Sequence, residues 1–346
     1  MCPRPSSRQH SSTPLSAVSS TPSPSASHSR WIRLDERVLA PYRRFSLYNS
    51  PYAAHDAGCA IDLYPAGSDP ETGASVAPSP VAGTVLETKR VRAPSKPYAC
   101  DYDYLILLDV EAPASAAGLV ARILHVDPQV TAGDRVSIGD PLGTLIRAGF
   151  FAPWVGTHLH LGFRPRDRDP YRASGSLPIT LGVDLDGWQW DGTGTVVRTG
   201  KTFVVLDAPT AGESPTESDA TEAGDAHGNG GAPETRDAPA DWVGLATDAP
   251  TGRVLDGGMS HYDYGGVLGG SVMANEPTPV VLCGTRVGVA TGRTVEWDAV
   301  TVQANGEPVT GLSLYCGRPG SLGIKVVVSE HEFEPGDPVV VTVDRH

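Results

Sequence analysis

The sequence is poor in lysine and carries an excess of acids. Only four of its 27 basic residues are lysine, and aspartate supplies 26 of its 40 acidic residues. This composition suits a halophilic protein in a medium of high salt, although a gene rich in G and C produces the same bias without a physical cause. The net charge of −13 argues against nucleic acid or an anionic membrane as the main partner, because both attract cations.

Long apolar runs and paired cysteine motifs are also missing. No stretch approaches the roughly 20 apolar residues that span a bilayer, and no apolar segment follows the first basic residues as in a signal peptide. The five cysteines form no CxxC motif, which argues against a zinc ribbon or a thioredoxin site. Cys59 with Cys100, and Cys283 with Cys316, could each form a disulfide; spacing alone leaves this open.

Composition divides the chain into four parts, and its length of 346 residues predicts two folded domains. Residues 1–30 contain eleven serines and five prolines and predict a disordered arm. Residues 208–241 are rich in glycine, alanine, threonine and acids, and predict a linker that carries eight acids against one arginine. We therefore expect folded domains over 31–207 and 242–346, whose own surfaces are only moderately acidic.

Both expected domains read as all-β. Between residues 52 and 207, short apolar runs such as "CAIDLY", "YLILLDV" and "LVARILHV" alternate with Gly, Pro and Asp, which is typical of strands joined by turns. We expect a β-meander sheet there. Residues 242–346 show similar runs, and Asn305-Gly306 is a strong hairpin signal. This second domain is expected to be a small β-sandwich or barrel.

Two histidines and an aspartate stand out within the first domain. In "GTHLHLGF", His158 and His160 are two residues apart, so a strand would place both on one face. Asp62 lies inside the apolar run "CAIDLY", where an acid is disfavoured unless a partner compensates it. That partner is either an arginine or a metal. His55 precedes this strand and can fold back towards Asp62, and His125 ends another apolar run just before a tight meander.

These motifs together resemble the lysostaphin-like zinc metallopeptidases, a family of peptidoglycan endopeptidases. The resemblance covers residues 51–165 and includes "AIDL", "VAGTV", "HVDPQVTAGDRVSIGDPLGTL" and "HLHLGFRP". It implies a metallopeptidase-type β-meander domain with zinc as the cofactor. It further implies zinc ligation by His55, Asp62 and His160, and catalysis by His125 and His158. Three protein ligands and one open position are typical of a hydrolytic zinc.

The sequence departs from the family in two places. The family has a histidine four residues before the aspartate, where this chain has Gly58, so that a longer loop must bring His55 to the site. Cys59 is an alternative ligand nearby. The segment before "HLH" is the bulky "GFFAPWVGT", whose aromatic residues Phe150, Phe151 and Trp154 either cover the core or form a changed substrate wall.

Three functions follow as hypotheses. The first is a zinc-dependent metallopeptidase acting on a peptide or cell-wall-like substrate, for which the family suggests a cell-surface or extracellular location. The second is a non-catalytic zinc-binding β-scaffold or regulatory protein. The third, a lipoyl-type carrier or sugar phosphocarrier, is disfavoured, because the carrier-like segment "VTAGDRVSIGDPLGTL" contains no lysine and Asp62 among the histidines favours a metal. In the second domain, residues 261–264 are expected to form a loop that positions a partner or covers the cleft.

Overall fold

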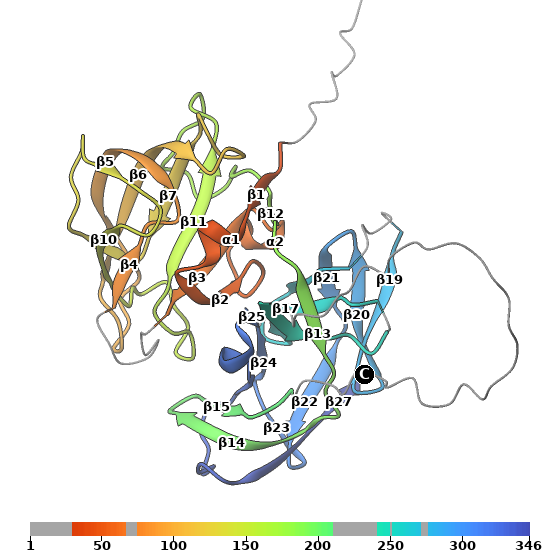
Figure 1. The fold of residues 1–346 in the computed structure, drawn as a ribbon. Coiled ribbons are helices and arrows are strands. Elements are labelled where there is room, and N and C mark those ends of the chain that lie inside the picture. The colour runs from red at the N-terminus through yellow and green to blue at the C-terminus, as the bar shows by residue number, and fades with distance from the viewer. Residues whose placement is uncertain (1–29, 67–74, 210–240, 250, 271–275) are drawn as a thin grey trace, which may run out of the picture.

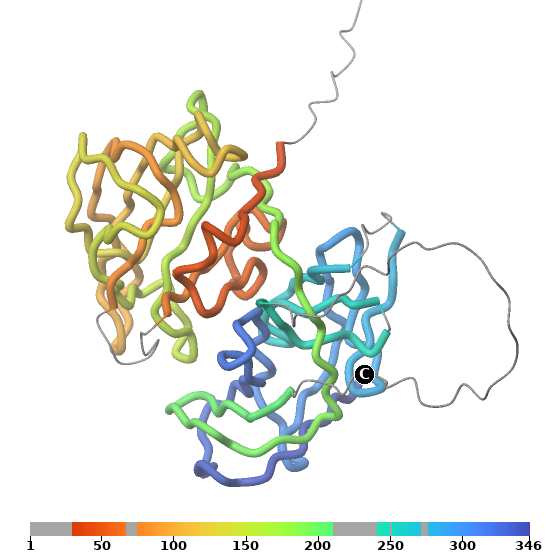
Figure 2. The backbone as a smooth tube through the Cα atoms, in the orientation of Figure 1, coloured from red at the N-terminus to blue at the C-terminus, as the bar shows by residue number. Residues whose placement is uncertain are grey.

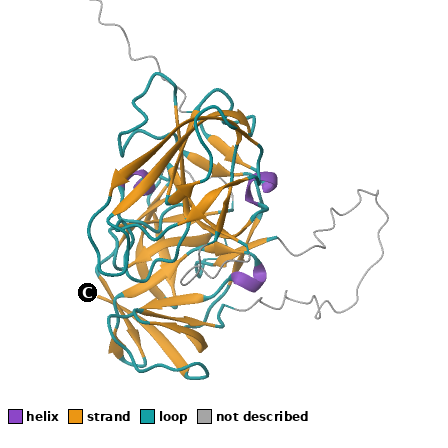
Figure 3. Cartoon of the chain, turned by 90° about the vertical axis from the view of Figure 1, so that its left-hand side faces the viewer, coloured by secondary structure: helices purple, strands orange, loops and turns teal. Residues whose placement is uncertain are grey.

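The computed structural model describes residues 30–66, 75–209, 241–249, 251–270 and 276–346. Strands dominate this part of the chain, and its helices are single turns (Figure 3), which confirms the expected all-β class. None of these helices has the length and apolar character needed to cross a membrane. The predicted arm and linker lie almost entirely outside the described residues.

The first large sheet has ten strands in the order β13-β16-β25-β2-β3-β11-β7-β6-β5-β9 (Figure 1). Its strands are β2 (Tyr42–Ser46), β3 (Ala60–Pro65), β5 (Ala82–Arg92), β6 (Tyr102–Ala112), β7 (Val120–Leu124), β9 (Arg135–Val136), β11 (Leu159–Arg164), β13 (Leu185–Trp188), β16 (Trp242–Leu245) and β25 (Cys316–Gly317). The predicted meander therefore forms, with β3, β11 and β7 as adjacent antiparallel strands near its middle.

Smaller elements surround this sheet. A three-stranded sheet contains β4 (Val76–Pro78), β10 (Pro141–Leu145) and β8 (Val126–Pro128), and β1 (Ile32–Leu34) pairs in parallel with β12 (Ile179–Leu181). The one-turn helices are α1 (Glu36–Leu39) and α2 (Ala53–Asp56). Asp35 caps α1, because its side chain accepts a hydrogen bond from the backbone N–H of Val38.

The second large sheet has twelve strands in the order β19-β20-β21-β18-β17-β24-β26-β15-β14-β27-β22-β23. Its elements are β14 (Thr193–Gly200), β15 (Phe203–Leu206), β17 (Val254–Met259), β18 (Tyr264–Leu268), β19 (Thr278–Leu282), β20 (Thr285–Thr291), β21 (Thr294–Trp297), β22 (Val300–Ala304), β23 (Glu307–Pro308), β24 (Gly311–Leu314), β26 (Ile324–Val327) and β27 (Pro338–Arg345), with a 3₁₀ turn, η1 (Pro319–Ser321). Asn305 and Gly306 have positive φ and join β22 to β23, as the hairpin signal predicts.

The sheets depart from the predicted division of the chain at residue 207. β14 and β15 precede that residue, yet they pair with β27 and β26 in the twelve-stranded sheet. Conversely, β16 and β25 follow the linker but pair with β13 and β2 in the ten-stranded sheet. In Figure 2 the chain passes from one half to the other along the green segment that holds β13. Composition could not reveal this, because a strand's partner depends on register with distant segments.

The two halves share their apolar interior. One cluster of buried residues fills the ten-stranded sheet around Phe45 and Ile61, and it includes Trp242 and Cys316 from the second half of the chain. The rings of Phe45 and Trp242 lie 4.8 Å apart. A second cluster, around Val204 and Leu255, fills the twelve-stranded sheet. The second domain is thus positioned to support residues of the first.

The described cysteines form no disulfide. Cys59, Cys100, Cys283 and Cys316 are all free, so neither of the pairings that spacing left open is present among them.

Candidate metal centre

The pairing of β3 with β11 places an aspartate opposite a histidine. Asp62 and His160 are direct partners in this antiparallel ladder, and His160 Nδ1 lies 2.9 Å from Asp62 Oδ1. His158 Nε2 lies 3.4 Å from the other carboxylate oxygen, Asp62 Oδ2. Both histidines of "HLH" therefore share one side of the sheet, as their spacing predicts.

His55 reaches the same carboxylate from helix α2. The chain turns from α2 into β3 at Gly58, whose φ of +61° is a left-handed conformation that glycine adopts without strain. This turn accommodates the unusual spacing between His55 and Asp62. His55 Nε2 lies 3.5 Å from Asp62 Oδ1 and 3.2 Å from His160 Nδ1. Its Nδ1–H donates to the carbonyl of Leu47 at 2.7 Å, which fixes the tautomer and leaves the Nε2 lone pair available.

The three donor atoms fit a tetrahedral metal. Donors bound to zinc at about 2.0–2.1 Å in tetrahedral geometry lie roughly 3.3 Å from one another. The three distances among His55 Nε2, Asp62 Oδ1 and His160 Nδ1 are 2.9, 3.2 and 3.5 Å. Among the described residues, these three form the group whose atoms could hold a metal ion together. Cys59 is not part of it, and its Sγ contacts the carbonyl of Ala57 instead.

The charges of the centre suit metal binding. Burial lowers the pKa of His158 and of His160 to about 4, although Asp62 opposes both shifts, so both imidazoles are neutral at neutral pH. Burial by itself would raise the pKa of Asp62, but His158, His55 and His160 together bring it below its ordinary value. The centre thus offers an ionised carboxylate and neutral imidazoles, which is the protonation state that a metal requires.

His125 stands beside this group with a carboxylate behind it. Its Nδ1–H donates to Asp103 Oδ2 at 2.7 Å, and its backbone N–H donates to Asp103 Oδ1 at 3.0 Å. The residue has a φ of 71°, an uncommon conformation that directs the chain between β7 and β8. Its ring centroid lies 5.1 Å from that of His158 and 5.9 Å from that of His160. All five histidine and aspartate residues predicted from the sequence are therefore gathered in one place.

Aromatic side chains enclose the centre. Phe151 stacks on His158 at 4.4 Å and meets His125 edge-on at 4.6 Å, whereas Phe150 lies farther out, 6.0 Å from Tyr52. The ring of Tyr64 lies 5.1 Å from that of His158. Phe151, which is 5% exposed, thus covers the buried histidines of the centre.

The second domain contributes to the centre as well. Burial raises the pKa of Tyr262, and the charge of Asp62 raises it further, which places this tyrosine in the electrostatic field of the site. The neighbouring His261 packs against Trp154 with a centroid distance of 5.1 Å. The expected loop covers residues 261–263 and lies against the segment that contains Trp154, whereas Tyr264 begins β18.

A buried aspartate of β17 holds the loop behind His55. Asp256 Oδ1 accepts a hydrogen bond from the Ser46 hydroxyl, and Asp256 Oδ2 accepts from the backbone N–H groups of Leu47 and Tyr48. Burial raises the pKa of Asp256 to about 7. Because the carbonyl of Leu47 orients His55, the second domain helps to fix an imidazole of the candidate centre through this carboxylate.

The sequence alone did not single out Asp103 or Asp256. Asp103 carries the same signal as Asp62, an acid inside an apolar strand, and that signal could have found it. Asp256 lies in the run "VLDGGM" and carries the same signal. Tyr262 belongs to the cluster at 261–264 that the sequence did single out, but only the fold shows that it lies near the first domain.

Comparison with known families gives two matches. Residues 33–181 match the N-terminal domain, and residues 216–344 the C-terminal domain, of DUF8155, a family described as a domain of unknown function. The chain carries both DUF8155 domains. The candidate centre, with His55, Asp62, His125, His158 and His160, lies wholly within the N-terminal match. No curated protein and no solved structure matches the chain.

Proposed function

We propose that this DUF8155 protein is a zinc-dependent hydrolase of the metallopeptidase type, which cleaves a peptide or amide bond. One observation carries the proposal: the donor atoms of His55, Asp62 and His160 form a triangle of zinc-ligand dimensions, with two further imidazoles beside it. The resemblance of residues 51–165 to the lysostaphin-like metallopeptidases supports the same roles for the same residues.

His55, Asp62 and His160 would hold the metal. Zinc supplies Lewis acidity at such a site, which makes a water more acidic and a carbonyl more electrophilic. The donor set of two imidazoles and one carboxylate favours zinc over magnesium or calcium, which prefer oxygen ligands. With three protein donors, one side of the centre stays open to water and substrate.

The two histidines outside the proposed ligand set, His158 and His125, would act as general base and general acid. His158 is neutral at neutral pH and donates its Nδ1–H to the carbonyl of Gly156 at 2.9 Å, so its Nε2 accepts the proton of the attacking water. The Asp103 carboxylate accepts the Nδ1–H of His125 and so orients its ring, with Nε2 on the other side. His125 would stabilise the oxyanion through an Nε2–H and give that proton to the leaving amine, and the proton that His158 took from the water would then restore His125.

The test is hydrolysis of a peptide panel by the zinc-loaded protein. We expect wild type to turn over at least one peptide, and His158→Ala and His125→Ala to lose activity by about 100-fold or more while retaining zinc. His331→Ala is the matched control, because this histidine contacts the carbonyl of Gly200 in the second domain and should keep full activity. Zinc at one equivalent without any His158-dependent turnover would contradict the enzyme and favour the alternative below.

The alternative is a non-catalytic zinc-binding β-scaffold or regulatory protein. The enclosure of the centre favours it, because His55, Asp62 and His158 are each less than 5% exposed. The side chains of His160 and His125 are more accessible to solvent, at 13% and 9% exposed. An enzyme needs that side to admit a peptide, whereas a scaffold does not.

A further inference from the structure

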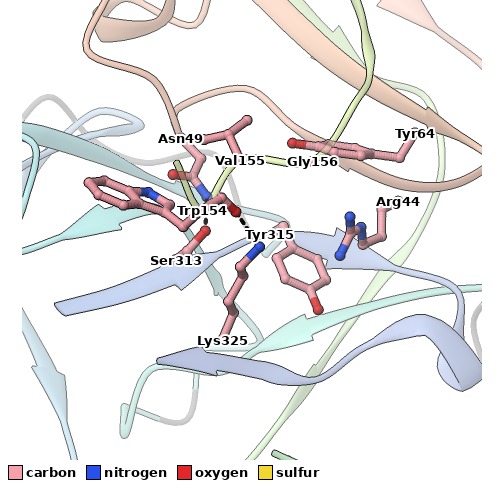
Figure 4. Close-up of a pocket in the computed structure, with 9 residues that line it drawn as sticks. All are labelled: Arg44, Asn49, Tyr64, Trp154, Val155, Gly156, Ser313, Tyr315 and Lys325. Atoms are coloured by element: carbon pink, nitrogen blue, oxygen red, sulfur yellow. Dashed lines mark hydrogen bonds between the residues drawn. The ribbon is translucent and has the colours of Figure 1, made fainter. Parts of the chain in front are cut away.

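A pocket lies next to the metal centre, between the two large sheets (Figure 4). Arg44 and Tyr64 enter it from β2 and β3 of the ten-stranded sheet, and Ser313 and Lys325 enter it from β24 and β26 of the twelve-stranded sheet. Its full lining is Arg44, Asn49, Tyr64, Trp154, Val155, Gly156, Ser313, Tyr315 and Lys325. Two of these residues are cations and none is acidic.

Arg44 is buried without a counter-ion. It is 6% exposed, and within the described part of the chain no carboxylate pairs with it and no atom accepts a hydrogen bond from its Nε. Its guanidinium carbon lies 4.4 Å from the ring centroid of Tyr64 and 4.6 Å from that of Tyr315. Figure 4 shows this guanidinium directed into the pocket. The two rings fix its position but neutralise none of its charge.

Lys325 adds a second buried cation. It is 4% exposed, its Nζ donates to the carbonyl of Trp154, and its charge lies 3.8 Å from the ring centroid of Phe203. Near Arg44, Asp62 faces three histidines, and Asp256 accepts from the segment at 46–48.

A buried guanidinium with free donors is unfavourable unless something compensates it, because removing an ion from water is far costlier than one hydrogen bond returns. A ligand that brings an anionic group supplies that compensation. Guanidinium groups bind carboxylates through two parallel hydrogen bonds, a geometry that an ammonium does not offer. The chemistry of the lining therefore favours a planar anion over a neutral or cationic group.

The pocket and the metal centre are adjacent along the same pair of strands. In the β2–β3 ladder Arg44 is paired with Tyr64, and Ser46 is paired with Asp62. Tyr64 and Asp62 are two residues apart and share one face of the strand, about 7 Å along it. Tyr64 packs on His158, and Gly156, which also lines the pocket, accepts the Nδ1–H of His158. A substrate carboxylate held by Arg44 would thus lie about one peptide unit away from a scissile bond placed at the candidate metal centre.

Asn49 gives the pocket a second orphaned polar atom. Its Nδ2 donates to the hydroxyl of Ser313 and to the carbonyl of Leu314, at 2.8 and 3.0 Å. The carbonyl partner fixes the amide orientation, so that the buried Oδ1 is the atom left without a donor among the described residues. An N–H group is what this oxygen lacks. The C-terminal residue of a peptide carries both groups: a carboxylate that could bind Arg44 and a backbone N–H that could donate to Asn49 Oδ1.

We propose that the Arg44 pocket binds a free carboxylate of the substrate, so that the centre acts on peptides or amides that carry a carboxylate close to the scissile bond. The identification of that carboxylate as part of a substrate rests on the proposed hydrolase. Binding of the carboxylate itself does not, and it is measured separately from turnover.

The test compares the binding of N-acetyl-Ala-Ala and of its C-terminal amide by calorimetry, to both zinc-loaded and metal-free protein. We expect the carboxylate form to bind wild type roughly 10- to 100-fold more tightly than the amide, in keeping with hydrogen bonds to a charged group. Arg44→Gln should abolish this preference and Arg44→Lys should keep part of it. Arg37→Gln, which removes the same charge from an exposed position, should leave it unchanged.

Several results would overturn the inference and leave the hydrolase to be judged on its own. They are equal affinity of wild type for the two ligands, no binding of either, or an unchanged preference in folded Arg44→Gln. Inorganic phosphate that displaces the acetylated dipeptide and binds more tightly would instead identify a phosphate site. If the preference holds but no peptide is hydrolysed in a His158-dependent manner, the pocket stands as a carboxylate site and the hydrolase fails.

Discussion

At the scale of single residues, the pair of Asp103 and His125 allows the proposed metal binding and the proposed catalysis to be tested separately. Asp103 does not belong to the candidate metal-binding group, yet it accepts the Nδ1–H of His125 and so fixes its tautomer and orientation. We predict that Asp103→Asn keeps zinc at wild-type stoichiometry and lowers kcat by a factor on the order of 10²–10⁴. Zinc content and steady-state kinetics measure the two effects. Asp109→Asn, on the same strand but paired with Arg166 on the surface, is the control.

Loss of zinc in Asp103→Asn, or an undiminished kcat, would remove His125 from the proposed chemistry.

The buried histidines also predict how stability depends on pH. Free histidines titrate near 6.5, whereas burial brings the pKa of His158 and of His160 to about 4 in the folded chain. Between these values the unfolded chain binds more protons, so the contribution of both residues to stability rises from pH 4 to about 6.5 and then levels off. Urea unfolding of the metal-free protein at several pH values measures it.

His158→Gln should flatten that profile in part, because one of the two histidines no longer titrates. A variant profile identical to that of wild type would mean that His158 is not the buried neutral imidazole described here. Zinc affinity should fall over the same acidic range, since protons compete with the metal for the imidazole nitrogens.

At the scale of elements, the turn between α2 and β3 delivers His55 to Asp62. A Cβ at Gly58 would lie 2.6 Å from the Tyr48 hydroxyl oxygen, in addition to the strain of its positive φ. We predict that Gly58→Ala destabilises the fold by more than the roughly 1–2 kcal/mol of left-handed strain, and weakens zinc binding. Gly118→Ala is the matched control, because its φ is +77° but nothing lies within 4 Å of its Cβ.

Urea unfolding and zinc titration of both variants measure the difference. Equal losses in the two variants would show that strain alone acts at Gly58 and that the turn does not govern the site.

The elements also show how far sequence patterns lead. The spacing of His158 and His160 and the position of Asp62 in an apolar run predict a shared face correctly, because strand periodicity is local. Neither pattern reveals that β3 and β11 are neighbours, since pairing depends on long-range register; for that step the family resemblance was needed. The pairing of β14 and β15 with β27 and β26 escaped composition for the same reason.

At the scale of the whole molecule, the second domain acts as a support for the centre. Asp256 of β17 accepts a hydrogen bond from the backbone N–H of Leu47, and the carbonyl of Leu47 accepts one from His55. A residue of the second domain therefore helps to position a histidine of the first. We predict that Asp256→Asn destabilises the protein by about 1–3 kcal/mol and weakens zinc binding, although Asp256 touches no metal-facing atom. Asp298→Asn, which breaks ion pairs with Arg286 and Arg345 away from the centre, should leave zinc affinity unchanged.

Unaltered zinc affinity in Asp256→Asn would show that the N-terminal domain arranges its centre unaided.

The central claim is that His55, Asp62 and His160 together bind one metal ion. Its most direct test is elemental analysis of the purified protein after removal of metal with a chelator and reloading with zinc. We predict one zinc per chain for wild type and for His125→Ala, and none for Asp62→Ala or His160→Ala in protein that remains folded. Wild type that takes up no zinc, or Asp62→Ala that keeps a full equivalent, would contradict the account.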